Sequence, residues 1–184
     1  MKNNQIRKLT GIALFAALII ILQLVSNYIT FGPISINLSL IPVILGSLIY
    51  GPIVGFIFGL VNGGLVLAAP STQAFFAINP VATVFVCLLK TGIAGMVCGF
   101  MPMIFKNHKK VAVILGSFLV PIINTGLFAV GSLIFFMDLF GSVEYLLLGA
   151  IGINFIVEVA VNGLLSPTIY LLFDFYNKKH PNNL

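Results

Sequence analysis

Two ionisable residues, Lys90 and Glu158, interrupt long stretches that otherwise carry no charge. A charge at membrane depth is expensive, so such a residue faces a protein interior or a wet cavity and marks a functional centre. The segment around the acid also places Asn154, Asn162 and Ser166 at four-residue intervals, which puts these polar groups on one helix face. We expect the two charges at similar depth, either as a structural ion pair or in contact with a polar ligand.

Several side-chain amides are expected to converge with these charges. Asn124 follows the predicted kink at Pro121, and Asn79 precedes Pro80 at the mouth of a predicted helix. Amides both donate and accept hydrogen bonds, which suits a ligand bearing hydroxyl and amide groups. The polar segments 30–37 and 70–77 are predicted to close the site, although they would also serve as plain connectors. The predicted substrate-binding residues are Asn37, Gln73, Asn79, Lys90, Asn124, Asn154 and Glu158.

Motifs for catalysis or phosphate binding are absent from the sequence. It contains no GxxxxGK[ST], HExxH, CxxC or GxSxG segment, and its histidines lie near segment ends. We therefore predict neither an enzyme nor a metal or cofactor site. The two cysteines, Cys87 and Cys98, lie about three helical turns apart and are expected to be buried apolar residues rather than a disulfide.

The composition indicates an integral membrane protein. Of the 184 residues, 60% are hydrophobic and only 7% are charged, and the mean hydropathy is +1.17. Soluble domains carry roughly 25% charged residues. The net charge of +5 comes from basic residues beside apolar runs, where they act as topology signals. We predict a lipid-embedded chain that does not bind nucleic acid.

The apolar runs predict an all-α fold, a six-helix transmembrane bundle forming one integral membrane domain over residues 1–184. The second helix is short for a span, so it is tilted, irregular or only partly inserted. The Gly51-Pro52 pair separates it from the third helix. The predicted helices cover residues 9–29, 36–50, 51–69, 80–105, 111–136 and 145–177.

The distribution of basic residues predicts the orientation. With six spans, eight of the nine Lys and Arg residues fall on the side that holds both termini. Positive residues mark the cytoplasmic side, so we predict that the N- and C-termini are both cytoplasmic. The segments 30–37 and 70–80 then face outward.

Small residues at four-residue spacing allow helices to approach closely in lipid. The glycines at 51, 55, 59 and 63 are expected to serve internal packing. Ala13 and Ala17 lie near the inner surface, where they either contact a partner helix or pack internally.

As a whole, the chain resembles, from about residue 5 to 177, the substrate-binding S components of energy-coupling factor (ECF) vitamin transporters. No single motif carries the resemblance, which rests on six helices with both ends inside and on several short segments. These segments are Ala13-xxx-Ala17, Tyr50–Gly55, Ile78–Thr83, Leu89–Gly92 and Pro121–Gly126.

The resemblance implies a protein of the bacterial cell membrane that captures a vitamin from outside between the outer loops and helices 4–6. Ala13 and Ala17 would contact a transmembrane T component, and ATP hydrolysis would belong to two separate ATP-binding cassette subunits. The absence of Trp is unlike the thiamine-type members, and the uncharged first outer loop is unlike the riboflavin-type members. The overall pattern is most similar to the pantothenate-type members. Folate, riboflavin, a pyridoxine-like compound or another metabolite stay open, as do a structural or assembly subunit and a self-sufficient channel or carrier.

Overall fold

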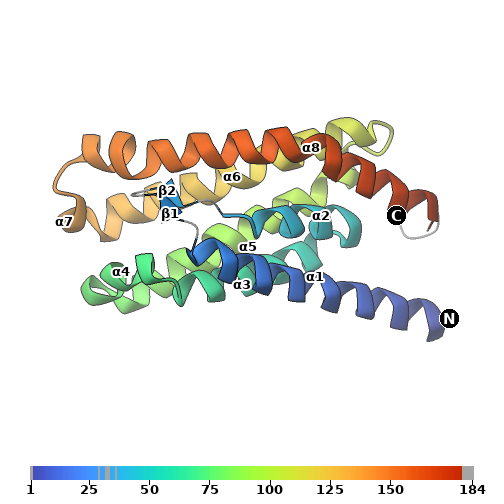
Figure 1. Ribbon diagram of the computed structural model, residues 1–184, viewed down its shortest axis with the longest axis horizontal. Helices are drawn as coiled ribbons and strands as arrows, with labels where there is room; N and C mark the ends of the chain where they lie inside the picture. The colour runs from blue at the N-terminus through green and yellow to red at the C-terminus, as the bar shows by residue number, and fades with distance from the viewer. Residues whose placement is uncertain (1, 29, 32–33, 36, 180–184) are drawn as a thin grey trace.

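The computed structural model describes residues 2–28, 30–31, 34–35 and 37–179 of the chain. This part is helical except for β1 (Thr30–Phe31) and β2 (Ile34–Ser35), which pair antiparallel (Figure 1). The long helices run nearly side by side and are joined by short helical turns. The helices are α1 (Lys2–Tyr28), α2 (Leu40–Tyr50), α3 (Pro52–Leu67), η1 (Pro70–Thr72), α4 (Gln73–Ile78), α5 (Pro80–Ile104), α6 (Lys109–Phe135), α7 (Met137–Phe140), η2 (Tyr145–Gly152) and α8 (Ile153–Lys179).

Four helices are long and apolar enough to cross a membrane, and a fifth span exists if α3 and the segment after its 76° bend are counted as one. The chain is therefore a multi-pass membrane protein. The six-span count stays a prediction, because α2 has only 11 residues. The qualifying helices are Gln5–Tyr28, Pro80–Ile104, Lys109–Phe135 and Tyr145–Lys179.

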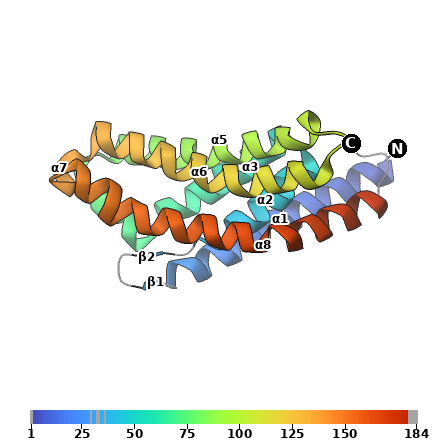
Figure 2. The same ribbon diagram turned by 90° about the horizontal axis from the view of Figure 1, so that it is seen from above.

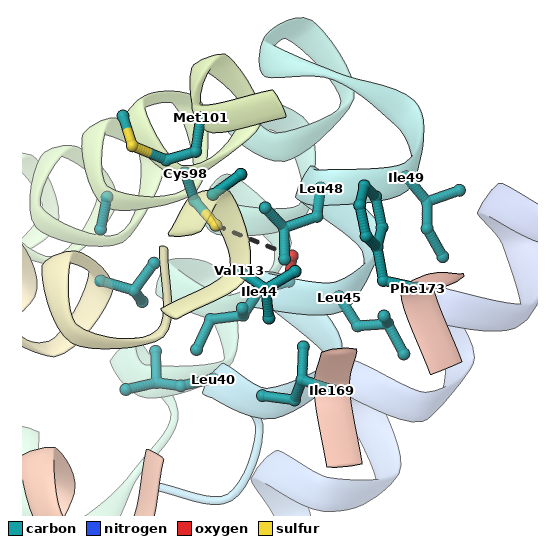
Figure 3. Close-up of a cluster of buried hydrophobic side chains, with 13 residues drawn as sticks. Leu40, Ile44, Leu45, Leu48, Ile49, Cys98, Met101, Val113, Ile169 and Phe173 are labelled. Atoms are coloured by element: carbon teal, nitrogen blue, oxygen red, sulfur yellow. Dashed lines mark hydrogen bonds between the residues drawn. The ribbon is translucent and has the colours of Figure 1, made fainter. Parts of the chain in front are cut away.

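The second predicted helix is buried rather than irregular. Nearly all of α2 is covered by α3, α5, α6 and α8, and its apolar side chains build the main core (Figure 3). A helix shielded by protein on every side does not need the length of a lipid-exposed span. The core residues include Leu40, Ile44, Leu48, Cys98, Val113, Val120, Ile169 and Phe173.

Glycines fix the close packing of α3 against α5, as predicted. A Cβ atom on Gly59 would overlap the Thr91 carbonyl, and one on Gly95 would overlap the Gly55 carbonyl. Gly51 adopts a φ of 90°, ends α2 through an N–H that donates to Ser47 O at 2.9 Å, and lets Pro52 start α3. Cys87 and Cys98 are buried and free, which confirms their predicted role.

One expectation about the outer segments was wrong. Residues 70–80 are not an open loop, because Pro70 begins η1 and Gln73 begins α4. The predicted third helix also ends earlier, at Leu67. In Figures 1 and 2 the start of α1 and the end of α8 lie at one end of the molecule, and α7 lies at the other. The α4 turn, β1 and β2 lie toward the α7 end.

Candidate functional site

A cavity of about 580 Å³ lies in the half of the molecule nearer α7. Its walls come from α1, α5, α6 and α8, together with the α3–α4 connection. It combines a polar side with a wall of phenylalanines. The lining residues are Gln23, Ser26, Asn27, Asn37, Val66, Ala69, Pro70, Ser71, Thr72, Phe75, Thr83, Val86, Cys87, Lys90, Asn124, Thr125, Phe128, Phe136, Phe140, Ile151, Asn154 and Glu158.

Lys90 and Glu158 both line this cavity, but they do not form the direct ion pair that was one of the two expectations. The Lys90 ammonium lies over the Phe128 ring, 4.6 Å from its centroid. Within the described residues, Lys178 pairs with Asp174, but no ion pair within 4.0 Å joins Lys90 to Glu158. The cation–π contact holds the ammonium beside Phe128, which also lines the cavity. Both charges therefore belong to the same cavity without contacting each other directly.

Glu158 is only 8% exposed and is held by polar groups of α6. Thr125 Oγ1 donates to Glu158 Oε2 at 3.3 Å, and the Asn124 side chain lies close to the same carboxylate. A buried carboxylate needs such donors to offset lost hydration. Asn124 is 5% exposed, and its Oδ1 has no hydrogen-bond partner within the part of the chain that the structure describes. An unsatisfied acceptor therefore lies beside the cavity, covered by protein in the ligand-free chain.

The predicted amides divide into two groups. Asn37, Asn124 and Asn154 line the cavity. Asn79 does not, because its Oδ1 accepts a hydrogen bond from Ala82 N at 3.1 Å and caps α5. Gln73 is exposed and lies outside the lining, with its Nε2 3.5 Å from the Leu67 and Ala69 carbonyls.

The polar stripe of α8 faces the protein interior, as expected. Asn162 and Ser166 are buried, but they lie outside the cavity lining. Asn162 Nδ2 donates to the Glu158 carbonyl at 2.8 Å. Of these four stripe residues, only the two nearer the start of α8, Asn154 and Glu158, therefore reach the cavity.

The C-terminal end of α1 also contributes to the cavity, which the sequence interpretation missed. Gln23, Ser26 and Asn27 line it. Gln23 Nε2 donates to Asn27 Oδ1 at 2.9 Å, and Ser26 Oγ accepts from Leu38 N at 2.9 Å. The signal was present, because three polar residues occupy neighbouring helical positions in an otherwise apolar run.

Ser39, which is fully buried, connects α1 to α3. Its Oγ lies 2.8 Å from Gln23 Oε1 and 2.6 Å from Asn62 Oδ1. One hydroxyl carries one proton, so it donates to one of these amide oxygens at a time. The arrangement fixes the edge of the cavity formed by α1.

The aromatic wall was also not predicted. Phe75 packs edge-on against Phe136 at 5.1 Å and Phe128 at 5.6 Å between ring centroids. Phe140 adds a tilted contact to the same ring at 6.0 Å. This apolar surface directly adjoins Lys90 through Phe128. The cavity therefore offers a cation, acceptor and donor amides, a carboxylate and an aromatic face to one occupant.

Ala13 and Ala17 lie far from this cavity, on the exposed face of α1. Their neighbours Leu9 and Leu14 are 69% and 62% exposed. The opposite face of the helix, which includes Ile19, packs inside the molecule. The two alanines therefore do not serve internal packing within the described chain.

Residues 7–172 match a protein family described as "ECF transporter, substrate-specific component". Two curated UPF0397 proteins of Streptococcus thermophilus, from strains ATCC BAA-491 / LMD-9 and CNRZ 1066, are each 42% identical over 65 residues. The aligned part is 35% of this chain and spans about a third of the length of these relatives, 36% of each. No solved structure matches the chain significantly.

Proposed function

The chain belongs to the family of ECF transporter substrate-specific components, and we propose that its 580 Å³ cavity binds a vitamin or related small metabolite for import. Members of this family are membrane subunits that bind substrate, so the chain is a transport subunit rather than an enzyme. The observation that carries the proposal is the convergence of Lys90, Glu158 and several amides on one enclosed space. Sites of this size and mixed polarity are typical of small-molecule binding.

The favoured substrate is pantothenate, or a compound that shares its groups. Its carboxylate is complementary to the Lys90 ammonium, and its hydroxyl and amide groups are complementary to Asn124, Asn154 and Glu158. Its methyl groups fit the phenylalanine wall. Folate-, riboflavin- and pyridoxine-type substrates are the alternatives, and an experiment with matched ligands distinguishes them.

We further propose that the exposed Ala13/Ala17 face of α1 docks a transmembrane T component, which works with two ATP-binding cassette ATPases. Small residues permit close helix approach in lipid, and the two alanines are exposed on α1. The end of the helical bundle that carries the basic residues and both termini would lie in the cytoplasm, so the cavity at the other end would open to the outside.

The decisive experiment measures binding to the purified chain in detergent by calorimetry and thermal shift. Pantothenate would be compared with pantothenol, its neutral alcohol analogue, and with folate, riboflavin and pyridoxine. We expect stoichiometric binding of pantothenate and at least about ten-fold weaker binding of the alcohol, since one lost charge-assisted hydrogen bond is worth about 1.5–3 kcal/mol.

Lys90→Met identifies the residue responsible for that preference. The substitution removes the cation but keeps an apolar stem beside Phe128. We expect it to weaken pantothenate far more than pantothenol, so that the two affinities converge. If no member of the panel binds the folded chain, the assignment of these vitamins is wrong, and the structural-subunit and channel alternatives are favoured. If another vitamin binds, only the substrate assignment changes.

A further inference from the structure

A second cavity, of about 350 Å³, lies at the opposite end of the molecule, where α1 begins and α8 ends. It is separate from the cavity described above and shares no lining residue with it. Its lining residues are Lys8, Leu48, Ile49, Tyr50, Gly51, Gly99, Pro102, Met103, Phe105, Lys106, Lys109, Ala112, Phe173 and Tyr176.

The cavity has an apolar floor and a basic rim. Leu48, Ala112 and Phe173 are at most 1% exposed and form the floor. Lys8, Lys106 and Lys109 are exposed and come from three different places, the start of α1, the α5–α6 connection and the first residue of α6. Tyr50 and Tyr176 pack edge to face on the wall, 5.9 Å apart. Such a site is complementary to an amphiphile with an anionic head.

The rim lysines differ from Lys110, Lys178 and Lys179 at the same end. Lys178 is paired with Asp174 at 2.7 Å. Lys110 lies over the Tyr170 ring at 5.7 Å, and Lys179 lies over a phenylalanine. In the described ranges, Lys8, Lys106 and Lys109 have neither an ion pair nor a ring contact of this kind. Three uncompensated cations therefore surround one cavity.

The start of α6 adds to this positive field. The helix is 27 residues long, and the His108 side chain makes no capping hydrogen bond at its N-terminus. The first N–H groups of a helix carry a partial positive charge and bind anions. Because Lys109 is both the first residue of α6 and a rim residue, the backbone donors and the lysine ammoniums act on the same place.

We propose that this cavity binds the headgroup of an anionic phospholipid. The phosphate lies among Lys8, Lys106 and Lys109, and the glycerol and upper acyl carbons cover the apolar floor. Basic pockets between membrane helices select such headgroups, and tyrosines are favoured at the same membrane depth. A topology signal alone needs basic residues near the surface, but it does not require them to surround a cavity.

Binding of short-chain phosphatidylglycerol to the purified chain tests the proposal. The titration in detergent would be repeated with short-chain phosphatidylcholine and with inorganic phosphate. We expect saturable binding of phosphatidylglycerol, at least about ten-fold tighter than either comparison, because each basic residue contributes to anionic lipid attraction. Equal binding of phosphatidylcholine would overturn the headgroup assignment. Equal binding of inorganic phosphate would replace the lipid with a soluble phosphate.

Two triple variants with the same change in net charge locate the site. Replacing Lys8, Lys106 and Lys109 with Gln is expected to weaken phosphatidylglycerol binding about ten-fold or more. Replacing Lys110, Lys178 and Lys179 with Gln, at the same end but outside the cavity, is expected to change it less than about two-fold. Equal losses in both would reduce the effect to overall charge and overturn the cavity site. If the first triple variant does not fold, Lys106→Gln and Lys110→Gln supply the same comparison.

Discussion

Asn124→Ala separates ligand recognition from folding at the centre of the cavity. The side chain is 5% exposed and faces the cavity, and its Oδ1 has no partner among the described residues. Its amide also lies close to Glu158. In the ligand-free chain, the substitution removes a polar neighbour of the carboxylate and one unpaired buried acceptor. The first loss is unfavourable and the second is favourable, so we expect the free energy of unfolding to change by less than about 1 kcal/mol.

The effect on ligand affinity is expected to be larger. A ligand donor that binds Asn124 Oδ1 would lose its partner in the variant and be left buried without a hydrogen bond. That loss costs about 1–3 kcal/mol. Since 1.4 kcal/mol corresponds to ten-fold, the dissociation constant should rise by roughly 5- to 150-fold. We therefore expect the variant to bind the ligand more weakly while its melting temperature stays close to that of the parent chain.

Calorimetry of the purified variant with the ligand identified in the panel measures the affinity, and thermal melting without ligand measures stability. Ser117→Ala is the matched control. Ser117 lies on the same helix, is fully buried, has an Oγ without a partner in the described part of the chain, and lies outside the cavity. The Ser117→Ala variant should bind the ligand as tightly as the parent chain does. A folded Asn124→Ala variant that binds as tightly as the parent would refute this account of the site.

Three further predictions concern topology, partner docking and packing. In a chain without native cysteines, a single cysteine at Lys109 should resist a membrane-impermeant thiol reagent in intact cells, whereas one in the α7–η2 connection should react. The reverse pattern would invert the orientation. Replacing Ala13 and Ala17 with Leu should abolish co-purification with a T component while ligand binding persists, and loss of both would contradict a docking role. Gly59→Val should destabilise the chain by about 3 kcal/mol in a thermal or denaturant assay, because the added Cβ meets the α5 backbone. Gly64→Ala is the control and should be neutral, because position 64 faces open space. Equal stability of the two variants would contradict the close α3–α5 packing.

The positions of the long helices were predictable because charges and prolines interrupt the apolar runs at their ends. The α3 to α4 region was not, since residues 51–80 contain no charged side chain. Pro70 and Pro80 mark the two boundaries, but polar composition between them is equally typical of a loop and of a short helix. Packing across the chain, including that of Phe75 against Phe128 of α6 and Phe140 of α7, accompanies the helical conformation and is not visible in the local sequence.

The position of a residue along its helix predicted the site better than the direction in which its side chain points. The rise per residue places Lys90 and Glu158 at similar depth, and both line one cavity. It does not say which way each side chain points, and Lys90 in fact reaches the Phe128 ring. Asn79 has the right depth for the mouth of the cavity, but as the residue before Pro80 it caps α5 instead.

The role of α1 explains why its polar residues were overlooked. The exposed alanines near its start favour a helix that serves partners, and only 17% of its spanning window is buried. In lipid, helices associate through van der Waals packing and interhelical hydrogen bonds, so a helix with few packing contacts depends more on polar contacts at its other end. Two serines make these polar contacts. Ser39 Oγ donates to Gln23 Oε1, and Ser26 Oγ accepts from the Leu38 N–H. The same contacts place Gln23 and Asn27 at the cavity, so the helix that offers a free face to the membrane also forms one wall of the ligand site.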